Sequence, residues 1–127
     1  MKVTKRILIV DDEEDIRDVV RVSLEEFAGW LTITAASGTE GLLIAKTEAL
    51  DAILLDISMP DINGFEICEE LQADSETQMI PVIVLTAKVL PSDQNRLAEL
   101  EVAGVITKPF DPMTIWRQVA EILGWSV

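Results

Sequence analysis

Five polar residues directly follow short aliphatic runs in this sequence: Asp11, Asp12, Asp56, Thr86 and Lys108. Carboxylates that lie close together repel each other and raise one another's pKa unless a cation is present. Mg²⁺ suits such a set, because it binds through carboxylates, water and phosphate oxygens. With a lysine and a hydroxyl group beside the carboxylates, the set could neutralise a phosphoryl group during transfer. Asp56 could then act as the nucleophile that forms an aspartyl phosphate.

The aliphatic runs predict the elements that position these side chains. Runs at residues 7–10, 31–34, 52–55, 82–85 and the weaker 105–106 are nearly continuous. Such runs are typical of parallel strands that are buried on both faces of a sheet. Because the carboxyl ends of parallel strands share one edge, and ligands bind beyond that edge, the five polar residues should converge there.

The stretches between the runs have helical spacing. One apolar stripe comprises Ile16, Val19, Val20, Leu24 and Phe27, and another comprises Ile115, Val119, Ile122 and Leu123. A third helix should begin at Gly64, and residues 39–49 and 92–101 should form two more. We expect Asp111 and Pro112 at the first turn of the last helix. Alternating strands and helices with right-handed crossovers predict an α/β, three-layer sandwich.

Composition excludes several classes of function. Acidic residues outnumber basic ones 23 to 10, and the net charge of −13 leaves no basic stripe for nucleic acid or anionic membranes. The sequence has no histidine, which excludes histidine-based catalysis and histidine-ligated zinc. The single Cys68 excludes an internal disulfide. Only four apolar residues follow the basic start, too few for a signal peptide, so we expect a cytoplasmic protein.

Four segments together resemble the response-regulator receiver domain of two-component signalling: residues 7–13, 54–64, 84–87 and 107–110. Their order, spacing and placement at strand ends all agree with that family, and the resemblance covers essentially the whole chain. It implies a CheY-like, flavodoxin-like fold with a five-stranded parallel sheet in the order 2-1-3-4-5. The expected organisation is a single receiver domain over residues 1–127 with no output domain.

The resemblance also implies a role for each acid. Asp56 is similar to the phosphoacceptor, and Asp12 to a direct ligand of Mg²⁺. Asp11 would hold metal-bound water, and the backbone carbonyl of Ser58 would complete the metal shell together with Asp56.

Two further residues match the family's switch. Thr86 resembles the hydroxyl that moves toward the phosphoryl group, and Lys108 resembles the lysine that bonds Asp56 or its phosphate. The family's bond between this lysine and the following proline is usually cis. Receivers usually carry an aromatic residue three positions before the lysine, where this chain has Val105. Valine cannot reproduce that aromatic rotation. Lys88 occupies a position that tunes dephosphorylation in the family, and we expect it to alter the lifetime of the phosphate.

The expected phosphodonor is a partner sensor histidine kinase or a histidine phosphotransfer protein, since this chain has no histidine. The chain is not itself expected to be a kinase, although it should catalyse its own phosphorylation from small phosphodonors and its own dephosphorylation. The signal should pass to a downstream protein through the surface of the fourth helix, fifth strand and fifth helix.

Three alternatives remain at this point. The chain could be a binding module that works without phosphorylation, for which the missing aromatic residue gives some support. A phosphatase acting through an aspartyl phosphate usually has a second aspartate two residues beyond the nucleophile, where this chain has Ser58. A flavin-binding protein is disfavoured, because three acids would face an anionic phosphate.

Overall fold

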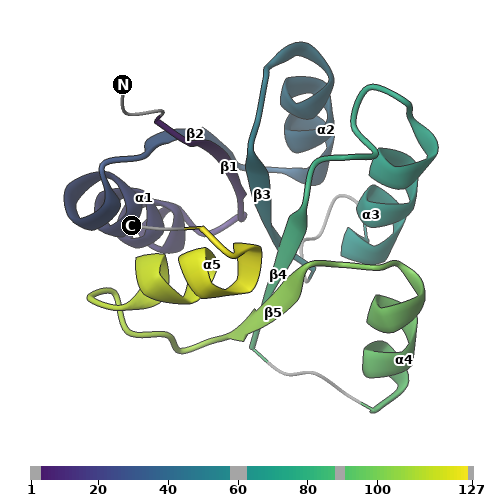
Figure 1. Ribbon diagram of the computed structural model, residues 1–127. Helices are drawn as coiled ribbons and strands as arrows, with labels where there is room; N and C mark the ends of the chain where they lie inside the picture. The colour runs from purple at the N-terminus through teal and green to yellow at the C-terminus, as the bar shows by residue number, and fades with distance from the viewer. Residues whose placement is uncertain (1–3, 58–62, 88–90, 126–127) are drawn as a thin grey trace.

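The computed structural model describes residues 4–57, 63–87 and 91–125, apart from the side chains of Ser92 and Asp93. Strands and helices alternate along the whole chain (Figure 1). In chain order the elements are β1 (Arg6–Val10), α1 (Glu14–Ala28), β2 (Leu31–Ala35), α2 (Gly38–Thr47), β3 (Ala52–Asp56), α3 (Gly64–Ala73), β4 (Val82–Thr86), α4 (Pro91–Glu99), β5 (Gly104–Thr107) and α5 (Ile115–Leu123).

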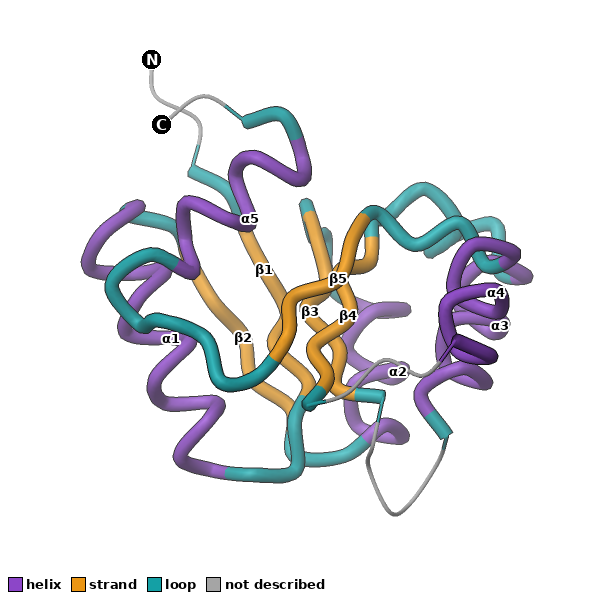
Figure 2. Tube along the Cα trace, turned by 90° about the horizontal axis from the view of Figure 1, so that it is seen from below, coloured by secondary structure: helices purple, strands orange, loops and turns teal. Residues whose placement is uncertain are grey.

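The five strands form one parallel sheet in the order β2-β1-β3-β4-β5, which confirms the predicted α/β fold. Figures 1 and 2 both place α1 and α5 on one side of the sheet and α2, α3 and α4 on the other. Successive side chains of a strand point to opposite faces. Accordingly, Ile7 and Ile9 pack in the core beneath α1 and α5, whereas Leu8 and Val10 pack in the core beneath the other three helices.

Helix α3 begins at Gly64 as predicted, directly after the segment that leaves β3. Asn63 caps it, because its side-chain oxygen accepts a hydrogen bond from the backbone N–H of Phe65 at 2.8 Å. A Cβ atom at position 64 would lie only 2.4 Å from the Cα atom of Ile57. Glycine is therefore what allows the start of α3 to approach the chain just beyond Asp56.

Part of the predicted stripe on α1 was wrong. Val19 and Phe27 were expected in the core, yet 36% and 46% of their surfaces are exposed. The buried face of α1 is narrower, since it faces only the sheet and α5, and it includes Ser23. Helix α1 ends at Ala28, and Trp30, just beyond it, supplies a buried aromatic side chain to this core.

Helix boundaries also differ from the prediction, and α2 ends at Thr47 rather than at residue 49. Helix α5 begins at Ile115 rather than beside Pro112, because Asp111 starts a separate turn in which its carboxylate accepts a hydrogen bond from the N–H of Met113 at 2.8 Å. Helix α4 ends at Glu99 rather than at residue 101, where Glu101 adopts a left-handed conformation with φ of 53°. Among the described residues, no helix is long and apolar enough to cross a membrane.

Candidate functional site

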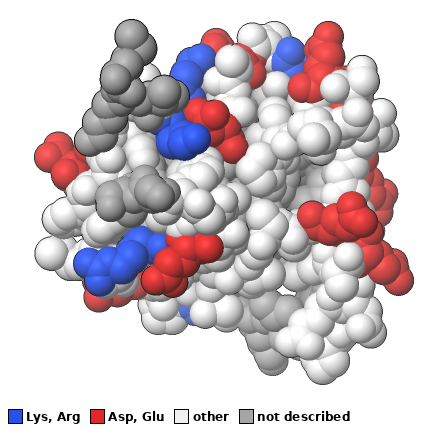
Figure 3. Space-filling model, in the orientation of Figure 1, with Lys and Arg blue, Asp and Glu red and all other residues white. Residues whose placement is uncertain are grey.

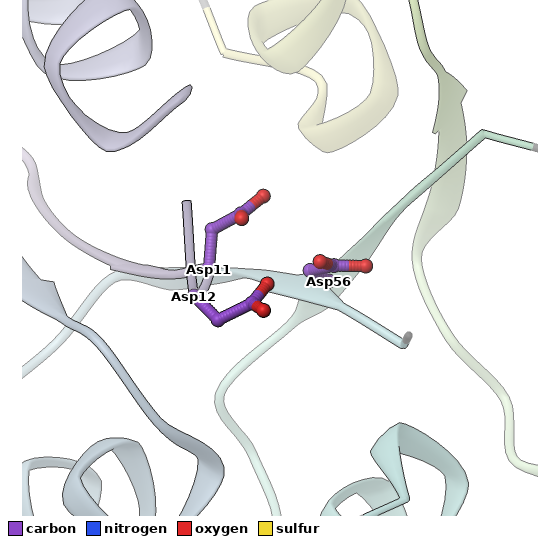
Figure 4. Close-up of side chains that lie close together, drawn as sticks. All are labelled: Asp11, Asp12 and Asp56. Carbon is purple, nitrogen blue, oxygen red and sulfur yellow. The ribbon is translucent and has the colours of Figure 1, made fainter. Parts of the chain in front are cut away.

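Three carboxylates lie together where β1 and β3 end. Each of Asp11, Asp12 and Asp56 can offer an oxygen atom such that all three oxygens lie within 4.8 Å of one another. Asp11 follows β1 directly and Asp56 is the last residue of the neighbouring β3, so strand register alone brings them side by side. Figure 4 shows the three side chains projecting from these strand ends toward the same region. Asp11 and Asp56 are buried, whereas Asp12 is exposed.

Lys108 faces these acids from the end of β5. Its Nζ lies 2.9 Å from Oδ2 of Asp11 and 3.5 Å from Oδ2 of Asp56. Burial alone would lower the pKa of Lys108. The hydrogen bond to Asp11 and the charges of Asp11, Asp56 and Glu13 outweigh that effect and raise its pKa above the usual value. The lysine is therefore a fixed positive charge at neutral pH. The peptide bond between Lys108 and Pro109 is cis, as the resemblance implied.

Every polar group of Asp11, in its backbone and in its side chain, forms a hydrogen bond. Its N–H donates to the carbonyl of Ala35 at 3.2 Å, and its Oδ1 accepts from the N–H of Glu13 at 2.9 Å. Its own carbonyl accepts from Nη1 of Arg17 at 2.8 Å, while Oδ2 binds Lys108. Sequence reasoning did not single out Arg17. The available signal was one basic residue within the otherwise acidic charges of residues 11–18.

Thr86 completes the described part of the site. It is the last residue of β4, is 1% exposed, and lies opposite Thr107 in the register of β4 and β5. Its carbonyl accepts a hydrogen bond from the N–H of Lys108 at 2.8 Å, which ties the two strand ends together. The two other residues assigned from the resemblance, Ser58 and Lys88, lie outside the described residues.

The donor set fits a magnesium ion. Lys108 forms ion pairs with Asp11 and Asp56, and the exposed Asp12 adds a third carboxylate to the same cluster. Carboxylate oxygens gathered at a partly buried site are the ligands that a hard divalent cation prefers. Asp11, Asp12 and Asp56 are the residues that would hold it. On the face drawn in Figure 3, basic side chains lie beside acidic ones and form no broad basic area.

Val105, which stands where receivers usually have an aromatic residue, is 36% exposed on β5. It lines a cavity of about 450 Å³ between α4 and β5. The other lining residues are Gln94, Leu97, Ala98, Val102 and Thr107. This open groove lies beside the strand that leads to Lys108.

Comparisons with known proteins agree with this geometry. Residues 7–120 match the model of the response regulator receiver domain. The chain is 40% identical over 119 residues to the alkaline phosphatase synthesis transcriptional regulatory protein PhoP of Bacillus subtilis, covering 94% of this chain and 48% of that protein. It is 36% identical over 118 residues to the DNA-binding dual master transcriptional regulator RpaA of Synechocystis, covering 93% of this chain and 48% of that protein.

The chain thus spans about half the length of these curated relatives. Both are named as transcriptional regulators, and RpaA is named as DNA-binding. The prediction of no direct nucleic-acid binding rests on the net charge of residues 1–127 and does not extend to further domains of such proteins.

Solved structures of similar fold are receivers as well. The chemotaxis protein CheY4 of Vibrio cholerae has a TM-score of 0.88 and 30% identity, covering 94% of this chain and 99% of that one. The receiver domain of the sensor histidine kinase PA1611 from Pseudomonas aeruginosa has a TM-score of 0.83 and 25% identity, covering 96% and 99%, and its structure holds magnesium in the active-site cleft. From its sequence match, its strand order and its acidic strand-end cluster, this chain belongs to the response-regulator receiver family.

Proposed function

We propose that Asp56 accepts a phosphoryl group, with the help of Mg²⁺, from a phosphohistidine of a sensor kinase or phosphotransfer protein. The observation that carries this proposal is the placement of Asp56, which lies at a strand end beside two further carboxylates and 3.5 Å from the Nζ of Lys108. The sequence of 127 residues has no histidine, so the donor histidine lies outside it. We place this reaction in the cytoplasm.

The chemistry is an in-line displacement. A carboxylate oxygen of Asp56 attacks the phosphorus atom, the phosphorus–nitrogen bond breaks, and its electron pair leaves with the imidazole nitrogen. The product is an aspartyl phosphate, a mixed anhydride. Water attack on phosphorus later releases inorganic phosphate and restores the carboxylate. When bound by Asp11, Asp12 and Asp56, Mg²⁺ would supply positive charge to the phosphoryl oxygens.

Lys108 and Thr86 would stabilise the negative charge of the phosphoryl group, and Thr86 would transmit its presence to β5. Lys108 carries a fixed positive charge that can pair with the phosphoryl oxygens without moving far from Asp56. Thr86, at the end of the neighbouring β4, can donate its hydroxyl proton to a phosphoryl oxygen. A shift of Thr86 would also displace β5, because β4 and β5 pair at this residue. We propose that α4, β5 and α5 carry this change to a downstream protein.

Intact-protein mass spectrometry after incubation with Mg²⁺ and acetyl phosphate tests the proposal. We expect an adduct of one phosphate on the wild-type protein and none on Asp56→Asn. Asp51→Asn is the matched control, because Asp51 is an exposed acid at the opposite end of β3 and should leave the adduct unchanged. A phosphate adduct on Asp56→Asn, or no phosphate adduct on the wild-type protein, would falsify the proposal.

The groove beside Val105 supports one alternative, a binding module that works without phosphorylation. In that case the groove would be open to a partner in every state of Asp56. Binding of a downstream partner would then be the same with and without acetyl phosphate, and the same in Asp56→Asn. A phosphate-dependent change in partner affinity decides in favour of the switch.

A further inference from the structure

Arg17, on the first turn of α1, binds a backbone carbonyl and not a neighbouring acid. Its sequence neighbours are mostly acidic, yet within the described residues its guanidinium forms no ion pair and donates from Nη1 to the backbone carbonyl of Asp11 at 2.8 Å. Arg21, one turn further along the same helix, behaves as a surface arginine. It pairs with Asp18 at 3.7 Å and with Glu25 at 3.4 Å.

The carbonyl that Arg17 binds belongs to the peptide that leads into Asp12. Because a peptide unit is planar, fixing the carbonyl of Asp11 also fixes the N–H of Asp12 and the direction in which its Cα continues. Asp12 needs this support. Its exposed side chain forms no hydrogen bond or ion pair with any residue that the structure describes, whereas Asp11 is tied at every polar group.

We propose that Arg17 is a positioning residue of the acidic cluster. Its guanidinium holds the peptide between Asp11 and Asp12 and thereby directs the Asp12 carboxylate toward Asp56 and the metal. This inference rests on the Mg²⁺ binding in the proposed function. Groups behind the ligands of a metal typically change its affinity by about tenfold or more when they are removed.

The positive charge of Arg17 opposes Mg²⁺ binding, whereas its positioning role favours it. The two roles therefore predict opposite changes in Mg²⁺ affinity when Arg17 is replaced. A cation beside three carboxylates weakens their attraction for Mg²⁺, so a purely electrostatic role predicts tighter binding when the charge is removed. A purely structural role in α1 predicts a lower melting temperature with unchanged Mg²⁺ affinity. Positioning alone predicts weaker binding.

Calorimetric titration with Mg²⁺, without any phosphodonor, separates these cases. We expect Arg17→Gln to weaken Mg²⁺ binding by about tenfold. Arg17→Lys should restore the affinity to within about threefold, because its ammonium group can donate to the same carbonyl. Arg21→Gln removes the same charge from the same helix and should not weaken Mg²⁺ binding. Unchanged or tighter binding in Arg17→Gln would overturn the proposal, and so would an Arg17→Lys protein no better than Arg17→Gln.

A second measurement needs no metal. In ¹H–¹⁵N spectra of the metal-free protein, Arg17→Gln should shift the amide signals of Asp12 and Glu13, and Arg21→Gln should leave them in place. Unshifted signals would overturn the proposal even if the melting temperature fell. If wild type bound Mg²⁺ but were never phosphorylated, the proposed function would fail while the role of Arg17 stood. If it bound no Mg²⁺, the proposed function would fail, and these spectra would still decide whether Arg17 holds the peptide.

Discussion

The two ends of the sheet bury polar groups in opposite ways. At the carboxyl end, the buried charges of Asp11 and Asp56 are paired with Lys108, which is 97 residues away from Asp11 in the chain. Near the amino ends of β4 and β5, the buried side chains of Cys68 and Thr77 line a cavity of about 470 Å³. The hydroxyl of Thr77 donates to the carbonyl of Leu71 at 2.6 Å, only six residues away. Burial, with a smaller effect of Glu69, raises the pKa of Cys68 to about 11, which keeps its thiol neutral.

The hydroxyl of Thr77 is thus satisfied locally and by an uncharged partner, as stability requires of a buried polar group. The carboxyl end concentrates like charges that only long-range contacts bring together, and their repulsion costs stability unless a cation joins them. Clusters of like charges such as this one are typical of binding and catalytic sites. Four substitutions test this difference between the two ends.

The largest effect should come from Lys108→Met. It removes the ammonium group that pairs with the buried Asp11 and Asp56, and removing one partner of a buried pair costs about 3 kcal/mol. We expect this loss of unfolding free energy in urea titrations with a chelator present, and part of it should return when Mg²⁺ is added. Lys46→Met, at an exposed position on α2, should change stability by less than about 0.5 kcal/mol. Equal stability of the two variants would show that the carboxyl end needs no counter-charge.

The same lysine predicts the pH dependence. A group whose pKa is raised by folding contributes its full stability below its unfolded value, about 10.4 for lysine. That contribution is lost as the pH rises through the higher folded value. The difference in stability between wild type and Lys108→Met should therefore be constant from neutral pH to about pH 10 and shrink above it.

The second effect is at the amino end. Thr77→Val removes a buried hydroxyl and leaves the carbonyl of Leu71 without this donor, at a cost of about 1–2 kcal/mol. Urea unfolding should show the loss equally with and without Mg²⁺, because Thr77 lies at the opposite end of the sheet from the acidic cluster. A loss that depended on Mg²⁺ would mean that the two ends are coupled.

A smaller gain is expected from Glu101→Gly, beside the same cavity. Glu101 has a φ of 53°, a left-handed conformation that costs a side-chain-bearing residue about 1 kcal/mol. Glycine adopts it freely, so thermal unfolding should shift to higher temperature. Ala98→Gly, inside α4, should instead lose about 1 kcal/mol. A loss of stability in Glu101→Gly as well as in Ala98→Gly would exclude strain at position 101.

The smallest effect is a gain from Asp12→Asn. In the absence of metal this substitution removes one of three mutually repelling carboxylates, so stability should rise by about 0.5 kcal/mol. Mg²⁺ affinity should fall in the same variant, because the amide oxygen that replaces the carboxylate carries no negative charge. Asp15→Asn, also on an exposed acid but in the first turn of α1, should not gain stability, since an acid there favours the helix. A loss of metal-free stability in Asp12→Asn contradicts the repulsion.

Much of the fold follows from local residue patterns. Strands buried on both faces must be aliphatic throughout, so the runs that become β1, β3 and β4 are visible in the sequence. Burial of α1 was harder to predict, because the width of its covered face depends on where α5 packs against it. Val19 and Phe27 have the right spacing for a core stripe and still lie at its exposed margin.

For the site, the positions of polar residues after aliphatic runs predict that Asp11, Asp56 and Lys108 come together, as they do. These residues and Thr86 each stand at the end of a parallel strand, and parallel strands end at one edge. How they pair is visible only in the folded protein. Lys108 bonds Asp11 more closely than Asp56, and Arg17 turns back to a carbonyl instead of a neighbouring acid. Long side chains have many rotamers and every residue has a carbonyl, so these partners depend on packing and not on residue type.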